Sequence, residues 1–248
     1  MHRFHIPPGT ANSPEVTLSP EESHHAFRVL RLAPGDAVTL LDGAGVEARG
    51  SVITADKRAV RVAVRERVVH PALLCAVTLL QALPKGRLMD TIVEKATELG
   101  VARIVPLLTE RTVSRPDEDH AASKVEKWQT TALEAVKQCG NPWLPRVEPP
   151  VTFADFLRRK ERFDLSLVAS LHPGTRPMRA VFAEFQAREG RRPASVAVWV
   201  GPEGDFTTQE MAALVSNSVQ PITLGSLVLR CDTAAVVTLA LALNEAAG

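Results

Sequence analysis

The first seventy residues alternate short hydrophobic and polar stretches in the rhythm of β-strands. Apolar segments at 37–41, 47–53 and 59–64 are separated by turn sequences that contain proline, glycine and aspartate. One helix is predicted between residues 19 and 30, where Ser-Pro-Glu-Glu provides a cap and a first turn before an apolar stretch. We therefore expect residues 1–70 to form a small β-barrel interrupted by one helix.

The pattern changes after the dipeptide His70-Pro71. Apolar runs at 73–80 and 104–107 alternate with helical spacing at 88–99, which is typical of a parallel α/β sheet. A proline between two segments of different period indicates a linker, so residues 73–248 are assigned to a second domain. Further helices are expected at 123–139, 152–160, 207–216 and 233–246, and further strands at 165–169, 195–200 and 221–224.

Two of the predicted strands end at glycine. The run at 195–200 stops at G-P-E-G (201–204), and the run at 221–224 stops at Gly225. In an open α/β sheet, ligands bind beyond the carboxyl ends of the strands, where glycine allows a ligand to approach the backbone closely. These two loops are therefore the expected ligand site.

Composition and charge exclude several classes of protein. The chain has 248 residues and is 45% hydrophobic, which is enough apolar material for a core. Its formal charge of +1 gives no global sign of a nucleic-acid partner. Three cysteines without C-x-x-C spacing argue against a disulfide framework and a zinc site. Adjacent His24 and His25 point in different directions on a helix, so no metal site is expected. With no membrane-spanning or signal-peptide run, a cytoplasmic protein without a membrane partner is expected.

The two glycine loops resemble a known signature. G-P-E-G, followed by L-G-S-L-V-L-R-C-D-T-A, resembles the C-terminal signature of SPOUT methyltransferases and is most similar to the RsmE family of 16S rRNA uracil N3-methyltransferases. H-H-A-F-R-V-L-R-L-A-P-G-D and Q-A-L-P-K-G-R-L-M-D resemble that family's N-terminal PUA-like domain and a loop of its catalytic domain. The resemblance covers nearly the whole chain. It implies a SPOUT α/β trefoil-knot domain preceded by a PUA-like β-barrel.

The resemblance also implies an activity and a set of partners. These are S-adenosyl-L-methionine as cofactor, uracil 1498 of 16S rRNA as the target, and a homodimer that acts on naked rRNA or on the assembled small ribosomal subunit. The implied cofactor-binding residues are Leu171, His172, Gly201, Gly204, Leu224, Gly225, Leu229 and Thr233. The implied RNA-binding residues are Arg3, Arg28, Arg31, Lys85 and Arg111. From the residues alone, a solvated helix face also explains Arg28 and Arg31, and a structural role also explains His172.

Methyl transfer from a sulfonium fits a site built mainly from backbone loops. The enzyme must chiefly position donor and acceptor and exclude water. As the proton leaves uracil N3, negative charge spreads to the neighbouring carbonyl oxygens, and Arg230 beside the second loop can stabilise that charge. Glu203 in the first loop is a second catalytic candidate, although an ion pair that ties the loops together explains it equally well. Asn141, Asp205 and Asp232 depart from the family pattern; aspartate at 205 still tolerates a left-handed backbone.

Three other functions remain open at this stage. A SPOUT enzyme could act on another rRNA or tRNA nucleotide. A non-catalytic RNA-binding protein would explain the basic N-terminal helix, yet it would not need paired strand-end glycine loops. A Rossmann-type dinucleotide enzyme would explain the α/β sheet, but the chain lacks G-x-G-x-x-G and the acidic residue that follows it.

Overall fold

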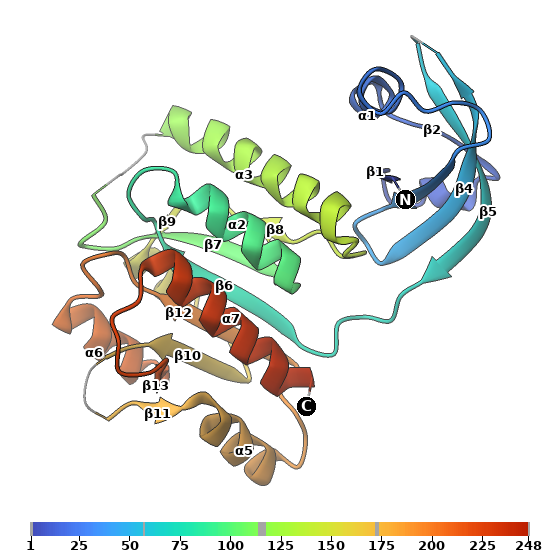
Figure 1. Cartoon of the computed structure of the whole chain (residues 1–248). Coiled ribbons are helices and arrows are strands. Elements are labelled where there is room, and N and C mark those ends of the chain that lie inside the picture. Colours follow the sequence, from blue (N-terminus) through green and yellow to red (C-terminus); the bar gives the residue numbers. More distant parts are fainter. Residues whose placement is uncertain (1, 57, 114–117, 172–173, 248) are drawn as a thin grey trace. The chain divides into compact units, whose positions relative to one another are not determined.

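The computed structural model describes residues 2–56, 58–113, 118–171 and 174–247 (Figure 1). The chain divides into two compact units: Met1–Ala72 with Leu133–Leu144, and Leu73–Ala132 with Pro145–Gly248. Helix α3 (Glu118–Cys139) therefore begins in the second unit and ends in the first. The sequence pattern did not indicate that residues 133–144 belong to the first unit, because residues 133–139 continue the helix that begins in the second.

The described strands of the first unit form one five-stranded sheet in the order β1-β3-β4-β5-β2. Strand β1 runs parallel to β3, and the other pairs are antiparallel. The strands are β1 (His2–His5), β2 (Glu15–Thr17), β3 (Ala37–Leu41), β4 (Val46–Ala55) and β5 (Val60–Val69). Phe4, Leu40 and Val62 are fully buried in the core of this unit. Strand β3 has the predicted bounds, and β5 is longer than predicted.

The predicted N-terminal helix divides into a short α-helix and a π-helical turn. Ser19 caps α1 (Pro20–His24) by accepting a hydrogen bond from the Glu22 amide at 3.2 Å. The chain continues as one π-helical turn, η2 (His25–Val29), and a short 3-10 turn, η1 (Thr10–Asn12), precedes β2. Arg31 lies beyond the helical residues with a left-handed φ of 56°. The expectation that Arg28 and Arg31 lie three apart on one helix is therefore wrong.

The eight strands described in the second unit form one parallel sheet, which confirms the α/β class. Its order is β11-β13-β10-β12-β6-β7-β8, and β9 also pairs with β7. The strands are β6 (Ala76–Ala82), β7 (Arg103–Leu108), β8 (Arg146–Val147), β9 (Val151–Thr152), β10 (Leu165–Ala169), β11 (Arg176–Pro177), β12 (Ser195–Val200) and β13 (Gln220–Thr223). The predicted strand at 73–80 is shifted, because Leu73 and Leu74 are exposed before the ladder begins.

Helices cover both faces of this sheet. On one face, α2 (Leu88–Leu99) and α7 (Cys231–Ala247) pack against each other, and α7 contacts β6 and β12 (Figure 1). On the other face, α4 (Phe153–Arg158) and α6 (Thr208–Ser216) contribute Phe153, Phe156 and Leu214 to a cluster around Trp199. Helix α5 (Met178–Glu189) packs beside α7 and was not predicted, although its buried Met178, Val181, Phe182 and Phe185 have helical spacing. The trefoil knot implied by the resemblance stays a prediction.

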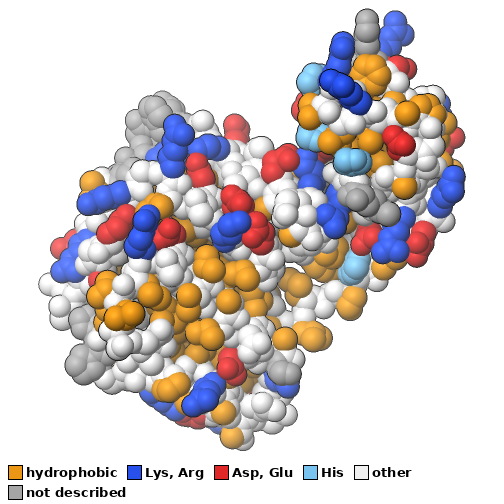
Figure 2. All heavy atoms as spheres, viewed as in Figure 1, with side chains coloured by type: hydrophobic (Ala, Val, Ile, Leu, Met, Phe, Trp, Pro, Cys, Tyr) orange, Lys and Arg blue, Asp and Glu red, His pale blue; other side chains and the backbone are white. Residues whose placement is uncertain are grey.

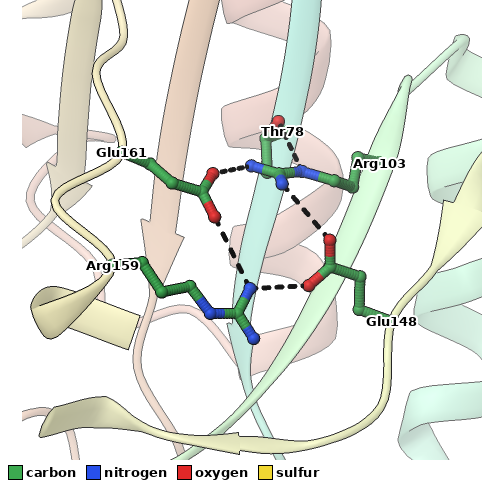
Figure 3. Close-up of polar contacts among 5 residues, drawn as sticks. All are labelled: Thr78, Arg103, Glu148, Arg159 and Glu161. Atoms are coloured by element: carbon green, nitrogen blue, oxygen red, sulfur yellow. Dashed lines mark hydrogen bonds and ion pairs between the residues drawn. The ribbon is translucent and has the colours of Figure 1, made fainter. Parts of the chain in front are cut away.

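A charged network joins β7 to the segments around α4 (Figure 3). Glu148 accepts hydrogen bonds from Arg103 at 3.2 Å and from Arg159 at 2.8 Å, and its side chain is only 7% exposed. Glu161 accepts from the same two arginines at 2.5 and 3.5 Å. Burial alone would raise the pKa of Glu148, but the Arg159 hydrogen bond and the charges of Arg103 and Arg159 outweigh it and lower that pKa below its ordinary value.

Glu148→Gln is expected to reduce the free energy of unfolding at pH 7 by about 1–3 kcal/mol, because two partly buried arginines lose the more deeply buried of the two carboxylates that they share. A pKa that is lower in the folded state stabilises the fold above the unfolded-state pKa, and this stabilisation is lost as the pH falls through the folded value. Urea unfolding at pH 7 and at several acidic pH values should therefore show the difference between wild type and variant shrinking in acid. Glu184→Gln, which breaks the exposed pair with Arg176, is the control and should have little effect. A pH-independent difference would contradict this role.

Candidate functional site

A pocket of about 390 Å³ lies at the carboxyl ends of β10, β12 and β13. The loop after each of these strands forms part of its wall, and the starts of α2 and α7 complete it. The lining residues are Leu88, Ala169, Ser170, Leu171, Val200, Gly201, Pro202, Glu203, Asp205, Leu224, Leu227, Val228, Leu229, Arg230, Cys231 and Ala234. The ligand site expected from the two glycine-terminated strands thus coincides with a pocket in the structure.

The loop after β12 is a tight turn. The Asp205 amide donates to the Pro202 carbonyl at 2.9 Å, and Asp205 has a left-handed φ of 62°. A Cβ atom at Gly201 would lie 3.0 Å from Asp205 Oδ1 and 3.3 Å from the Phe206 ring, so a side chain at 201 has little room. Asp205 thus has the left-handed backbone that aspartate was expected to tolerate at this position.

Neighbouring loops hold this turn in place. Glu203 Oε1 accepts a hydrogen bond from the Lys85 amide at 2.9 Å, and Arg111 donates to the Gly204 carbonyl. Beyond the turn, Thr207 and Glu210 form the capping box of α6, and Glu210 also accepts from the Glu110 amide at 2.8 Å. The loops after β6, β7 and β12 are therefore tied together, and the Arg111 side chain is engaged in that tie.

The loop after β13 contributes the second wall. Gly225 has a φ of 121°, a conformation that L side chains rarely adopt, and its amide donates to Thr223 Oγ1 at 3.1 Å. Leu227 and Val228 are 75% and 83% exposed at the rim of the pocket. This bend therefore places the following residues around the pocket while leaving apolar side chains open to solvent.

Arg230 lies at the end of this loop and lines the pocket. Its side chain is 72% exposed, and its Nε lies 3.4 Å from Asp232 Oδ1. An ion pair between Glu203 and Arg230, which would tie the two loops together, is not formed among the described residues, where Arg230 pairs with Asp232. Burial, with the charges of Glu203 and Asp232, raises the pKa of the Cys231 thiol, which keeps this pocket cysteine protonated.

The structure brings together four of the eight residues expected at the cofactor site. Leu171, Gly201, Leu224 and Leu229 line the pocket together with both catalytic candidates, Glu203 and Arg230. Gly204, Gly225 and Thr233 are not lining residues: the first packs on Arg111, the second provides the bend, and the third is exposed on α7. His172 lies outside the described residues. Leu88 was missed, because it reaches the pocket only through the packing of α2 beside the sheet.

The candidates for RNA binding differ in whether their side chains are exposed or engaged within the protein. Arg28 is exposed and stacks over the Phe27 ring at 5.5 Å, and Lys85 is exposed in the loop after β6. Arg3 lies within β1 rather than before the first strand, and its Nη1 donates to the carbonyls of Lys137 and Gln138 at 3.2 and 2.8 Å. Arg3 therefore caps the carboxyl end of α3, which favours a structural role.

Two further features concern the part of the chain that the structure describes. There, none of the helices is both long and apolar enough to span a bilayer. In the same residues, no three His, Cys, Asp or Glu side chains are grouped so that they could hold a metal ion.

Comparison with known proteins identifies the class of this fold and pocket. Residues 71–243 match the model of an RNA methyltransferase domain, and residues 18–65 match that of an RNA methyltransferase PUA domain. The fold and the site therefore define a two-domain RNA methyltransferase. The chain is 34% identical to the ribosomal RNA small subunit methyltransferase E of Synechocystis sp., over 96% of this chain and 76% of the relative. It belongs to the ribosomal RNA small subunit methyltransferase E family.

Solved structures resemble this fold over nearly its whole length. A ribosomal RNA small subunit methyltransferase E from Neisseria gonorrhoeae, bound to S-adenosyl methionine, is 26% identical with a TM-score of 0.85, and the match covers 98% of this chain and 97% of that one. A Legionella pneumophila protein in complex with the bound cofactor SAM is 31% identical with a TM-score of 0.85 over the same shares of the two chains. The resemblance inferred from the sequence motifs is thus confirmed.

Proposed function

We propose that this protein transfers a methyl group from S-adenosyl-L-methionine to N3 of uracil 1498 in 16S rRNA. The observation that carries the proposal is the pocket at the carboxyl ends of β10, β12 and β13, which brings Glu203 and Arg230 together in a chain of this family. A cytoplasmic location belongs to the same proposal, because ribosomal RNA is found there.

The residues of the pocket fit such a cofactor. Its volume of about 390 Å³ lies within the range of roughly 300–1000 Å³ that is usual for small-molecule sites. Leu88, Leu224 and Leu229 offer apolar surface for the adenine and the methionine chain, while Glu203 and Asp205 offer carboxylates for its positively charged groups. When bound, the cofactor supplies a methyl group on a sulfonium.

The protein's own contribution is positioning and charge. The ties from Arg111 and the Lys85 amide hold the G-P-E-G turn rigid, so its backbone is ready for the ligand. Arg230 is exposed at the pocket, where its guanidinium would face the uracil carbonyl oxygens that gain negative charge as the N3 proton leaves. We assign Glu203 a positioning role, because its carboxylate holds the Lys85 loop.

The RNA substrate would be held by exposed cations outside this pocket. Arg28 and Arg31 are exposed in the unit that matches the PUA domain model, and Lys85 is exposed in the methyltransferase domain. Each phosphate contact releases condensed counterions, so these residues would make binding depend on salt. We propose 16S rRNA, naked or within the small ribosomal subunit, as the partner.

The proposed activity is tested with purified protein, S-adenosyl-L-methionine labelled on its methyl group, and small subunits from a strain that lacks the gene. Mass spectrometry of the rRNA should locate one new methyl group at N3 of uracil 1498, with both naked rRNA and subunits offered as substrates. A methyl group found on another rRNA or tRNA nucleotide would show that uracil 1498 is not the target. RNA binding without any transfer would leave a non-catalytic RNA-binding protein.

We propose further that the protein is a homodimer joined through the methyltransferase domain. Hydrophobic side chains gather over α7 and the loop that precedes it (Figure 2), and they include the exposed Leu227, Val228 and Leu241. Apolar patches of this kind commonly mark protein interfaces. A second copy of the chain would cover them next to the cofactor pocket.

The double variant Val228→Asp with Leu241→Asp is expected to be monomeric in sedimentation velocity experiments at concentrations where the wild type is dimeric. Two carboxylates would have to be desolvated in the interface without partners, which strongly opposes association. Val29→Asp, which changes an exposed valine of the first unit, should stay dimeric and serves as the control. A wild type that sediments as a monomer, or a double variant that stays dimeric, would contradict this interface.

A further inference from the structure

A second pocket, of about 220 Å³, lies beside the start of α2. Its walls come from the loop after β6 and from α3, and its charged lining residues are Arg87, Asp90, Lys124 and Lys127. The pocket contains no residue of the cofactor pocket. Leu88 lines the cofactor pocket, whereas its neighbours Arg87 and Met89 line this one, so the two pockets flank the first turn of α2.

The charges in this pocket are not balanced. Both oxygens of Asp90 are engaged, one by the Trp128 indole at 3.1 Å and the other by the Lys127 ammonium. Arg87 and Lys124 make no ion pair and no side-chain hydrogen bond with another described residue. The pocket thus has three cations and one carboxylate, which leaves an excess of positive charge in a concave site, where it attracts anions.

The architecture of the pocket holds one of those cations, Lys127, through Asp90. Trp128 is 4% exposed and its indole fixes Asp90, which in turn orients Lys127, the residue before Trp128 on α3. Lys124 lies one turn earlier on the same helix and is half-buried. The pocket is therefore built on two helices and a buried aromatic residue, and its exposed cations Arg87 and Lys127 remain open to a ligand.

We infer that this pocket binds a backbone phosphate of the RNA substrate, at a nucleotide that flanks the methylated uracil. The inference rests on the proposed function, which supplies RNA as the anionic partner. The volume is smaller than the roughly 300 Å³ at which sites for whole small molecules begin, so the pocket suits a phosphate group better than a complete nucleotide. Its place across one helical turn from the cofactor pocket puts that phosphate close to the acceptor base.

The double variant Arg87→Gln with Lys124→Gln tests this assignment in the full-length protein. The probe is a synthetic RNA with the 16S rRNA segment around uracil 1498, and its affinity is measured over a series of salt concentrations. Two lost contacts should lower the salt slope by roughly 1 to 1.5 and weaken binding about tenfold at moderate salt, because each contact with single-stranded RNA contributes about 0.7 to the slope. The affinity for S-adenosyl-L-methionine should not change.

The control variant is Arg158→Gln with Arg179→Gln, which removes two exposed arginines of α4 and α5 that line neither pocket. It should keep the wild-type salt slope. If the wild type methylated rRNA but the pocket variant kept the wild-type salt slope, the phosphate site would be overturned and the proposed function would stand. If the wild type transferred no methyl group but the pocket variant still had a lower salt slope, the proposed function would be overturned and the phosphate site would stand.

Inorganic phosphate separates the two sources of such an anion. In a titration of wild-type protein, free phosphate should bind only weakly and should compete with the RNA probe at high concentration. Tight phosphate binding that disappears in the Arg87→Gln, Lys124→Gln variant while RNA affinity stays unchanged would overturn the assignment to RNA.

Discussion

Replacing Arg230 by alanine is expected to lower the rate of methylation at saturating RNA and cofactor about a hundredfold to a thousandfold. The guanidinium would meet the charge on the uracil carbonyl oxygens mainly in the transition state, so the rate should fall far more than the affinity for either substrate. Arg230→Lys should recover only part of the loss, because lysine keeps the charge without the planar fork. Raising the pH should help the alanine variant more than the wild type, since more of the uracil is already deprotonated.

Single-turnover rates across a pH series measure this effect. Arg188→Ala is a matched control, because Arg188 is an exposed arginine of the same unit that pairs with Glu189 and does not line the cofactor pocket. Its rate should equal that of the wild type. If Arg230→Ala instead weakened the binding of cofactor or RNA and left the saturated rate unchanged, Arg230 would be a positioning residue without a role in charge stabilisation.

Gly225→Val is expected to weaken the binding of S-adenosyl-L-methionine by roughly 5-fold to 150-fold, which corresponds to about 1–3 kcal/mol of backbone strain. The reason is the φ of 121° at Gly225, since the space around its Cβ position is open. Valine would relieve the strain by moving the loop, and Leu224, Leu229 and Arg230 would move with it. Titration calorimetry gives the affinity, and circular dichroism verifies the fold.

Gly190→Val is the control for this variant. Gly190 also has a left-handed φ, of 67°, and open space at its Cβ position, but it ends α5 away from the cofactor pocket. Both variants carry the strain of a valine at positive φ, and only Gly225→Val should lose cofactor affinity. A folded Gly225→Val protein that binds the cofactor as the wild type does would place the cofactor elsewhere.

Local patterns predicted most of the secondary structure. The strands at 165–169 and 195–200 and the helix at 88–99 have the predicted bounds, because a buried apolar run and helical spacing are both local properties of the chain. The capping box of α6 is local in the same way, since Thr207 and Glu210 lie within four successive residues. Where the pattern was less distinct, as at the start of β6 and in α5, the prediction was shifted or missing.

The function could also be inferred from the sequence, because the motifs that indicate it are local. Glycine at the ends of two parallel strands marks a ligand site, and the motifs around those glycines resemble one family closely enough to imply its fold and chemistry. Leu171, Gly201, Leu224 and Leu229 were named from the sequence, and they meet in one pocket. Chain segments that follow neighbouring parallel strands must converge at one edge of the sheet, so local motifs were sufficient here.

By itself, then, the sequence determined the two kinds of domain, the strand-end loops and the family. The tertiary structure alone decided which side chains these elements bring together. It placed Leu88 in the cofactor pocket, used Arg3 to cap α3, and paired Arg230 with Asp232 rather than with Glu203. The physical reason is that a propensity or a turn acts over a few neighbouring residues, whereas the partner of a guanidinium depends on atoms that are distant in the chain and close only after folding.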